Sequence, residues 1–305
     1  MSISAEVEAK HREEARIAAE LYTAGLAPDV SIAAWHTALS VARSEVVETL
    51  RDTNCLADVP AALTANARHA RVLRALMAPP ISQDQFAILC PAYNKAKEND
   101  GRPLSADKAE TIAAALLAGR DRRLTKWLER GGDPRPREIR VLVQSISPIL
   151  GQQAMSTKRR GGMSADQEGA VVDLLLSKQW TRMKGTNLVE TPGTVPPRHF
   201  LKKIRFATDD QPQEVDIACG LRKGVVLAME CKVTNDPTNS IKRINDILKK
   251  ARAWQKHWAA FVRTAALLQG VIEYKDVARL LGENVEVFWS HRLEDFEAWI
   301  DREAD

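Results

Sequence analysis

The sequence has few cysteines and no long apolar run. Four cysteines occur in 305 residues, Cys55, Cys90, Cys219 and Cys231, and no two form a C-x-x-C pair. This spacing disfavours a zinc site and a disulfide framework and is typical of a reducing compartment. No stretch approaches the roughly 18 apolar residues of a membrane span, and the charged N-terminus MSISAEVEAKHREEARIAAE lacks the apolar centre of a signal peptide. We therefore predict a cytoplasmic protein with no membrane partner.

The sequence also lacks an internal repeat and histidines at metal-ligand spacing. His11, His36 and His69 stand alone within helical patterns, which indicates packing or surface positions. Hydrophobic residues make up 45% of the chain and charged residues 28%, as in globular proteins. A chain of this length is long enough for two domains.

Positive charge is concentrated in one part of the chain. The net charge of +4 conceals an excess of nine positive charges between residues 156 and 263 and an excess of six negative charges from residue 264 onward. A local basic excess favours a partner with a phosphate backbone.

The first half reads as helical. Apolar residues at three- and four-residue steps and clear capping signals predict helices at residues 4–24, 31–51, 60–77, 83–98, 105–118, 121–130 and 136–150. We predict an all-α domain over residues 1–155, used for DNA recognition or dimerisation. An arginine cluster around residues 120–140 is either a DNA-contacting surface or a solvated face with Trp127 in the core.

A basic segment, STKRRGGM, follows at residues 156–163. Lys158, Arg159 and Arg160 could lie along a DNA backbone, or the segment could merely join two domains. Ser164 then caps a predicted helix over residues 165–179 that carries Glu168 near its start.

The most informative stretch is QEVDIACGLRKGVVLAMECK, residues 213–232. It reads as a strand carrying Asp216, a turn, and an apolar strand carrying Glu230, Cys231 and Lys232. Because strand side chains alternate, Glu230 and Lys232 share one face, and antiparallel pairing can bring Asp216 beside Glu230. Solvated charges on a half-exposed strand edge are the alternative interpretation.

Two carboxylates on one face call for a compensating cation. Hard oxygen ligands suit Mg²⁺ or Mn²⁺, which could stabilise charge on a phosphoryl oxygen while Lys232 orients an attacking water. This is the outline of a phosphodiester hydrolase.

Asp216 followed by Glu230-x-Lys232 resembles the PD-(D/E)XK nuclease superfamily, although Val215 stands where that pattern has proline. The resemblance implies that Asp216, Glu230 and Lys232 are catalytic. It also implies that Asp216, Glu230 and the Cys231 carbonyl bind metal, with Glu168 as a further ligand. A first-turn glutamate favoured by the helix dipole is the other explanation of Glu168.

The segment after Lys232 begins a basic amphipathic helix at Asp236-Pro237. Five polar residues near its start could reach phosphates or base edges: Asn235, Asn239, Ser240, Lys242 and Arg243. ECK-V-x-N followed by Asn-Ser-x-Lys-Arg resembles the XamI-like type II restriction endonucleases.

The remaining elements complete a mixed sheet, with strands at 264–272 and 285–289 and helices at 274–282 and 293–302. We predict an α/β fold: a restriction-endonuclease-like mixed β-sheet core flanked by helices over residues 156–305, which follows the all-α N-terminal domain in the sequence.

The predicted function is that of a type II restriction endonuclease, cutting double-stranded DNA at a short palindromic site with Mg²⁺, for which Mn²⁺ can substitute. A homodimer and a cognate DNA methyltransferase in the host are implied. A repair or junction-resolving nuclease and a non-catalytic DNA-binding regulator are the alternatives.

Overall fold

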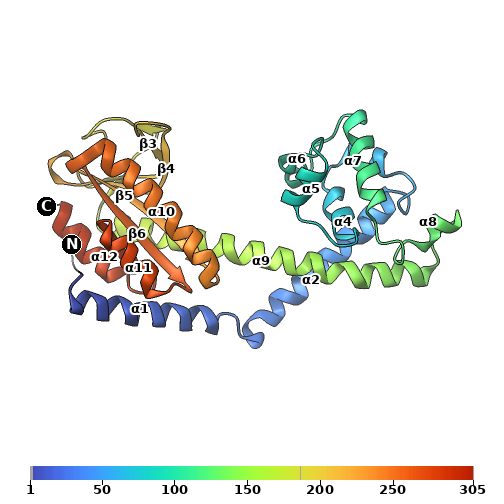
Figure 1. The fold of residues 1–305 in the computed structure, drawn as a ribbon, viewed down its shortest axis with the longest axis horizontal. Helices are drawn as coiled ribbons and strands as arrows, with labels where there is room; N and C mark the ends of the chain where they lie inside the picture. Colours follow the sequence, from blue (N-terminus) through green and yellow to red (C-terminus); the bar gives the residue numbers. More distant parts are fainter. Residues whose placement is uncertain (1–2, 186, 305) are drawn as a thin grey trace. The chain divides into compact units, whose positions relative to one another are not determined.

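The computed structural model describes residues 3–185 and 187–304, apart from the side chain of Arg160. Contacts group the chain into two compact units. The helical unit spans Ser31–Lys158, and the second unit combines the segment up to Val30 with Arg159 onward. Figure 1 shows the elements of both.

The helical unit is built from short helices around one core. These are α2 (Pro28–Asp52), α3 (Val59–Ala65), α4 (His69–Ala75), α5 (Gln83–Leu89), α6 (Lys95–Asp100), α7 (Ala106–Ala118), α8 (Lys126–Arg130) and the first part of α9 (Pro136–Ser177). The predicted helices at 60–77 and 83–98 are each two helices, because Asn66 and Cys90 adopt extended backbone and end α3 and α5. Trp127 is buried, and its indole N–H donates to the Cys55 carbonyl at 2.9 Å.

Helix α9 corrects the prediction of a new helix capped by Ser164, because Ser164 lies inside one continuous helix. It continues through residues 156–163, including Gly161 and Gly162, where a Cβ would meet nothing within 4 Å. Two glycines cost a helix about 2 kcal/mol. Packing on both sides compensates, since Leu150 is buried in one core and Val171 in another.

Helix α1 (Ala5–Ala24) belongs with the second unit, which differs from the predicted domain of residues 1–155. Ala15 and Ala18 pack in a core with residues of α10 and α11. Glu14, almost fully buried, accepts from His291 at 2.7 Å and also pairs with Arg292. Sequence periodicity identified the helix but not the surface on which it packs.

The second unit contains a seven-stranded mixed sheet. Its strands are β1 (Thr181–Arg182), β2 (Leu188–Val189), β3 (His199–Phe206), β4 (Gln213–Gly220), β5 (Val226–Thr234), β6 (Val262–Gly270) and β7 (Val285–Trp289). The order is β1-β3-β4-β5-β6-β7, with β2 also paired to β3. β3, β4 and β5 are antiparallel, and α10 (Pro237–Trp258) then crosses to β6, which is parallel to β5. This confirms the predicted mixed α/β fold.

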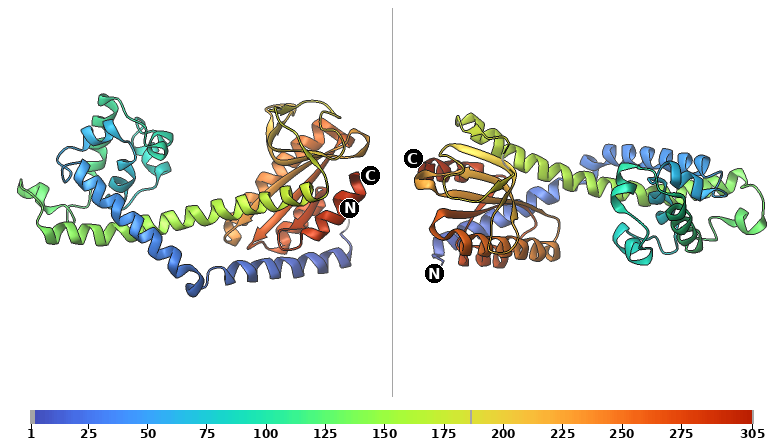
Figure 2. Two further views of the ribbon diagram at one scale, coloured as in Figure 1. Left: turned by 180° about the vertical axis from the view of Figure 1, so that it is seen from behind. Right: turned by 90° about the horizontal axis from the view of Figure 1, so that it is seen from above.

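Helices cover both faces of the sheet (Figures 1 and 2). On one face, α10, α11 (Tyr274–Gly282) and α1 pack against β6 and β7. The end of α9 and α12 (Leu293–Ala304) pack on the other face against β3 to β7. On β5, Leu227 and Met229 face α9 and α12, while Val226 and Ala228 share a cluster with Trp254 and Trp258 of α10. Because the alternation continues along β5, Cys231 faces α9 and α12, whereas Glu230 faces α10.

None of the helices in the described ranges is long and apolar enough to cross a membrane.

The buried pair Arg74–Glu98 holds the helical unit together. Arg74 donates to Glu98 at 2.5 and 3.0 Å, Tyr93 donates at 2.6 Å, and Gln83 donates at 2.6 Å. We predict that Glu98→Ala lowers the free energy of unfolding by about 3–5 kcal/mol, because it leaves a guanidinium buried without its anion. Urea denaturation measures this. Glu110→Ala, at an exposed position of α7, is the control and should change little; equal effects of the two substitutions would contradict the assignment.

Candidate active site

Asp216, Glu230 and Lys232 come together on β4 and β5. The antiparallel ladder pairs Ile217 with Met229, the residues next to Asp216 and Glu230. The Lys232 ammonium lies 2.6 Å from Glu230 Oε2 and 3.4 Å from Asp216 Oδ2. One cation thus touches both carboxylates.

Asp216 is held by three donors. The backbone N–H of Cys231 donates to Oδ2 at 2.8 Å, and Lys203 of β3 donates to Oδ1 at 2.5 Å. Lys232 is the third. Burial opposes ionisation, but the cations and the N–H outweigh it and hold the pKa of Asp216 below its ordinary value.

Glu230 is fully buried, and a helix supplies its second cation. Lys250 of α10 donates to Oε1 at 3.0 Å and to Oε2 at 2.9 Å, and also to the Glu214 carbonyl at 2.9 Å. Burial raises the pKa of Glu230, and Lys232 and Lys250 only partly offset the increase. Although burial lowers it, the pKa of Lys232 is raised overall by Glu230 and Asp216, so this ammonium is charged at neutral pH.

Glu168 approaches the same place from α9. Its side chain is 7% exposed and pairs with Lys202 at 3.2 Å and Lys203 at 2.7 Å. Lys203 therefore joins Glu168 to Asp216. The structure thus brings together Glu168, Asp216, Glu230 and Lys232, which the sequence had selected from separate segments.

The strands are irregular at this point. Lys203 has a φ of +54°, in the left-handed region that side chains other than glycine rarely adopt. Leu201 and Ile204, three residues apart, face the same cluster, as do Val215 and Ala218. The normal alternation shifts by one residue at both Lys203 and Asp216, which lie opposite each other. This shift lets two consecutive lysines, Lys202 and Lys203, reach Glu168.

The donor set suits a hard divalent cation. In the described chain, no three histidine, cysteine or acidic side chains stand close enough to hold a metal ion as they are placed. Instead, a lysine ammonium lies between Glu168 and Asp216, 2.7 and 2.5 Å from their oxygens. Carboxylate oxygens are ligands that Mg²⁺ and Mn²⁺ prefer, so the chemistry of Glu168 and Asp216 suits such an ion, which would take the place of the ammonium.

Cys231 contributes its backbone to the site. Its side chain is buried in the core facing α9 and α12, and burial raises the pKa of its thiol well above the ordinary value. Its N–H orients Asp216. The predicted metal contact of the Cys231 carbonyl stays a prediction.

Three lysines of the site, Lys202, Lys203 and Lys250, were not identified from the sequence as site residues. Lys250 is one of several cations on the amphipathic helix that begins at Asp236-Pro237. Lys250 follows exposed Lys249 and is itself half-buried. No sequence signal separates the two, because only the packing of α10 over β5 distinguishes them.

The predicted DNA-contacting residues differ in exposure. Asn239, Lys242 and Arg243 are exposed near the start of α10, and Asn235 is half-buried just before it. Asp236 caps this helix, as predicted, by accepting from the Asn239 N–H at 2.9 Å. Ser240, in contrast, is fully buried and donates to Asp276 at 3.1 Å. Its hydroxyl is used in joining α10 to α11, which leaves it out of the DNA contact proposed below.

The basic segment of α9 is also partly accessible. Lys158 is exposed and Arg159 half-buried. The side chain of Arg160 lies outside the described residues.

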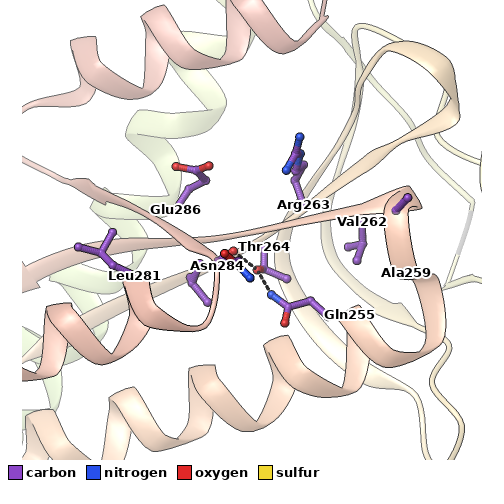
Figure 3. A pocket seen from close by; sticks show the side chains of 10 residues that line it. Gln255, Ala259, Val262, Arg263, Thr264, Leu281, Asn284 and Glu286 are labelled. Carbon is purple, nitrogen blue, oxygen red and sulfur yellow. Dashed lines mark hydrogen bonds between the residues drawn. The ribbon is translucent and has the colours of Figure 1, made fainter. Parts of the chain in front are cut away.

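A surface pocket lies at the other end of the parallel strands (Figure 3). It is lined at the start of β6 and β7 by residues such as Arg263 and Glu286, and Thr264 accepts there from Gln255 at 3.0 Å. Glu230 and Lys232 lie further along β5 than the residues paired with this end. The pocket contains none of the candidate catalytic residues.

Removing Lys250 should destabilise the protein by leaving Glu230 under-compensated. For Lys250→Met we expect a loss of about 1.5–3 kcal/mol in the metal-free protein, the range for a hydrogen bond to a charged group. The double variant Lys250→Met, Glu230→Gln should regain part of the lost stability, because a neutral amide needs no counter-ion. Urea unfolding measures both, and exposed Lys249→Met serves as the control. Equal stability of the two single variants would contradict this role.

The comparisons with known proteins identify the family of this chain. The family described as XamI restriction endonuclease matches residues 53–289. The type II restriction enzyme XamI of Xanthomonas campestris pv. amaranthicola is 27% identical over 196 residues, which are 61% of this chain and 66% of that enzyme. The chain thus spans just under two thirds of this relative.

A solved structure, protein VC1899 from Vibrio cholerae, is 9% identical and covers 88% of this chain and 56% of its own, with a TM-score of 0.30. That score is too low to support an argument about fold. The family match extends over most of both units and includes Asp216, Glu230 and Lys232. The chain belongs to the XamI restriction endonuclease family.

Proposed function

We propose that this protein is a type II restriction endonuclease that hydrolyses phosphodiester bonds of double-stranded DNA at a specific short site, with Mg²⁺ as its metal. The observation that carries the proposal is the convergence of Glu168, Asp216 and Glu230 with Lys232 in a protein of this family. Three carboxylates buried close together need compensating cations, which lysines supply in the structure. A divalent cation used in catalysis would be held by the same oxygens.

Asp216 and Glu230 would hold the metal, with Glu168 and the Cys231 carbonyl completing the ligand set. When bound, the ion would lower the pKa of a coordinated water and stabilise charge on the phosphoryl oxygens. Mn²⁺ offers the same hard-ligand chemistry and could substitute.

Lys232 would position the attacking water. Its raised pKa keeps it protonated, so it acts as a hydrogen-bond donor and as a positive charge near the phosphate. The Cys231 N–H holds Asp216, and Lys250 holds Glu230, each in one orientation. This pre-organisation reduces the rearrangement needed when DNA arrives.

DNA would meet the site along its basic surroundings. Lys242 and Arg243 of α10, with Asn235 and Asn239, would contact phosphates or base edges, and Lys158, Arg159 and Arg160 of α9 would contact the backbone. The local excess of positive charge between residues 156 and 263 supports this arrangement.

A two-fold homodimer would place one site on each strand of a palindrome. A host that carries such a nuclease needs a DNA methyltransferase to protect its own sites. The four cysteines are free, in keeping with the reducing cytoplasm proposed as its location.

A non-catalytic regulator would have no use for three buried carboxylates, and a repair or junction-resolving nuclease would differ in its substrate.

Digestion of unmethylated phage DNA with Mg²⁺ tests the activity. The native protein should give discrete fragments, whereas Asp216→Asn and Lys232→Ala should cut at least about 10²-fold more slowly, as when an electrostatic catalytic group is removed. Gel-shift assays and circular dichroism check that both variants still bind DNA and fold. Cutting of branched DNA alone would favour a junction nuclease. Binding without cutting by the native protein would support the regulator instead.

The DNA-binding surface has a separate test. The double variant Lys242→Ala, Arg243→Ala should bind DNA more weakly and reduce the slope of log K against log salt by about one to two, roughly one per phosphate contact. Fluorescence anisotropy over a salt series measures this in Ca²⁺, without cleavage. Arg252→Ala, on the same helix but paired with Glu283 at 2.7 Å, is the matched control. An unchanged slope in the double variant would place the contact elsewhere.

A further inference from the structure

Lys203 holds an unusual position in the candidate site. It is the residue that contacts both Glu168 and Asp216, through one ammonium 2.7 and 2.5 Å from their oxygens. Its neighbour Lys202 contacts Glu168 at 3.2 Å. The two lysines carry the same charge and share one carboxylate, but only Lys203 lies between two carboxylates.

The backbone of Lys203 is arranged for this contact. Its φ of +54° and the shifted alternation around it turn the side chain toward Asp216, the residue opposite on β4. A non-glycine residue in this region costs about 1–2 kcal/mol. The two ion pairs offset that cost only while the ammonium stays between the carboxylates.

We propose that Lys203 is an internal counter-cation that occupies the metal position in the metal-free protein and is displaced when the metal binds. This inference rests on the proposed function, because it assumes that Glu168 and Asp216 bind the metal. An ammonium and a divalent ion cannot both lie between the same two oxygens, since the space and the lone pairs are shared.

The position of Lys203 permits the displacement. Its side chain is 47% exposed, compared with 13% for Lys232 and 14% for Lys250. The ammonium can therefore move into water, while Lys232 and Lys250 stay enclosed beside Glu230. Lys203 keeps the two carboxylates close together until the metal replaces it.

The proposal predicts that metal binds more tightly without Lys203. In the native protein, the metal must displace the Lys203 ammonium from Glu168 and Asp216 before it is coordinated. In Lys203→Met these two contacts are absent, while Lys202 stays beside Glu168 and Lys232 beside Asp216. Mn²⁺ should bind Lys203→Met about ten- to a hundredfold more tightly than it binds the native protein, the factor expected for losing one charged hydrogen bond. Electron paramagnetic resonance of free Mn²⁺, with isothermal calorimetry, measures this without DNA and without turnover.

Three variants make the test specific. Lys202→Met removes an equal charge from Glu168 but leaves the space between the carboxylates filled, so its Mn²⁺ affinity should rise much less. Lys203→Arg keeps a cation and should bind Mn²⁺ about as the native protein does. Lys203→Gly removes the ammonium and adopts positive φ without strain, so it replaces Lys203→Met if that variant does not fold.

The outcomes separate the two proposals. Tighter Mn²⁺ binding by Lys203→Met or Lys203→Gly, with little change in Lys202→Met, supports displacement. Unchanged or weaker binding in the Lys203 variants, or an equal rise in Lys202→Met, overturns it while leaving the metal site intact. If neither the native protein nor the Lys203 variants bind Mn²⁺, and Asp216→Asn makes no difference, the metal site itself fails and the displacement fails with it.

Discussion

The candidate site depends on the balance of charge around a fully buried carboxylate, Glu230. Burial in the middle of a sheet favours the neutral form of a glutamate and raises the pKa of Glu230, and nearby cations offset part of that increase. Lys232 on the same strand and Lys250 on the covering helix supply those cations, both within 3.0 Å. The crossover helix α10 therefore does more than cover the sheet. By packing on β5 it completes the electrostatics of the site, which links the stability of this region to its chemistry.

The same principle extends outward across the sheet. Asp216 shares Lys232 with Glu230 and shares Lys203 with Glu168, so carboxylates and ammonium groups alternate from β5 through β4 and β3 to α9. Each anion has at least two cationic partners. A chain of this kind keeps like charges close together, which a metal site requires, without the energetic cost of unpaired burial. If a metal ion binds between these carboxylates, as we propose, at least one ammonium would have to move.

The order of the strands and helices and most of the candidate site could be predicted from the sequence, whereas contacts between distant surfaces could not. The β-β-α order was predicted from strand alternation, the turn before Val225 and the capping signal at Asp236-Pro237. The same local rules predicted that Asp216 lies near Glu230. Lys250 and the packing of α1 were missed because both depend on which surfaces meet after folding. Ser240 looked like a polar residue free to contact DNA, yet it is buried against Asp276. Short-range pattern does not distinguish a polar residue facing water from one that joins two helices.

The break in strand alternation at Lys203 is the least predictable feature and has the largest effect on the site. Regular alternation would put Lys202 and Lys203 on opposite faces, and only one of them could reach Glu168. The left-handed backbone at Lys203 changes this and directs both lysines to one carboxylate. Since the conformation is unfavourable for lysine, other interactions offset its cost, among them the pairing of β3 with β4 on both sides of Lys203 and the ion pairs with Asp216 and Glu168. If a metal ion replaced the Lys203 ammonium, as we propose, those ion pairs would be lost, and metal binding would then be coupled to the local shape of β3.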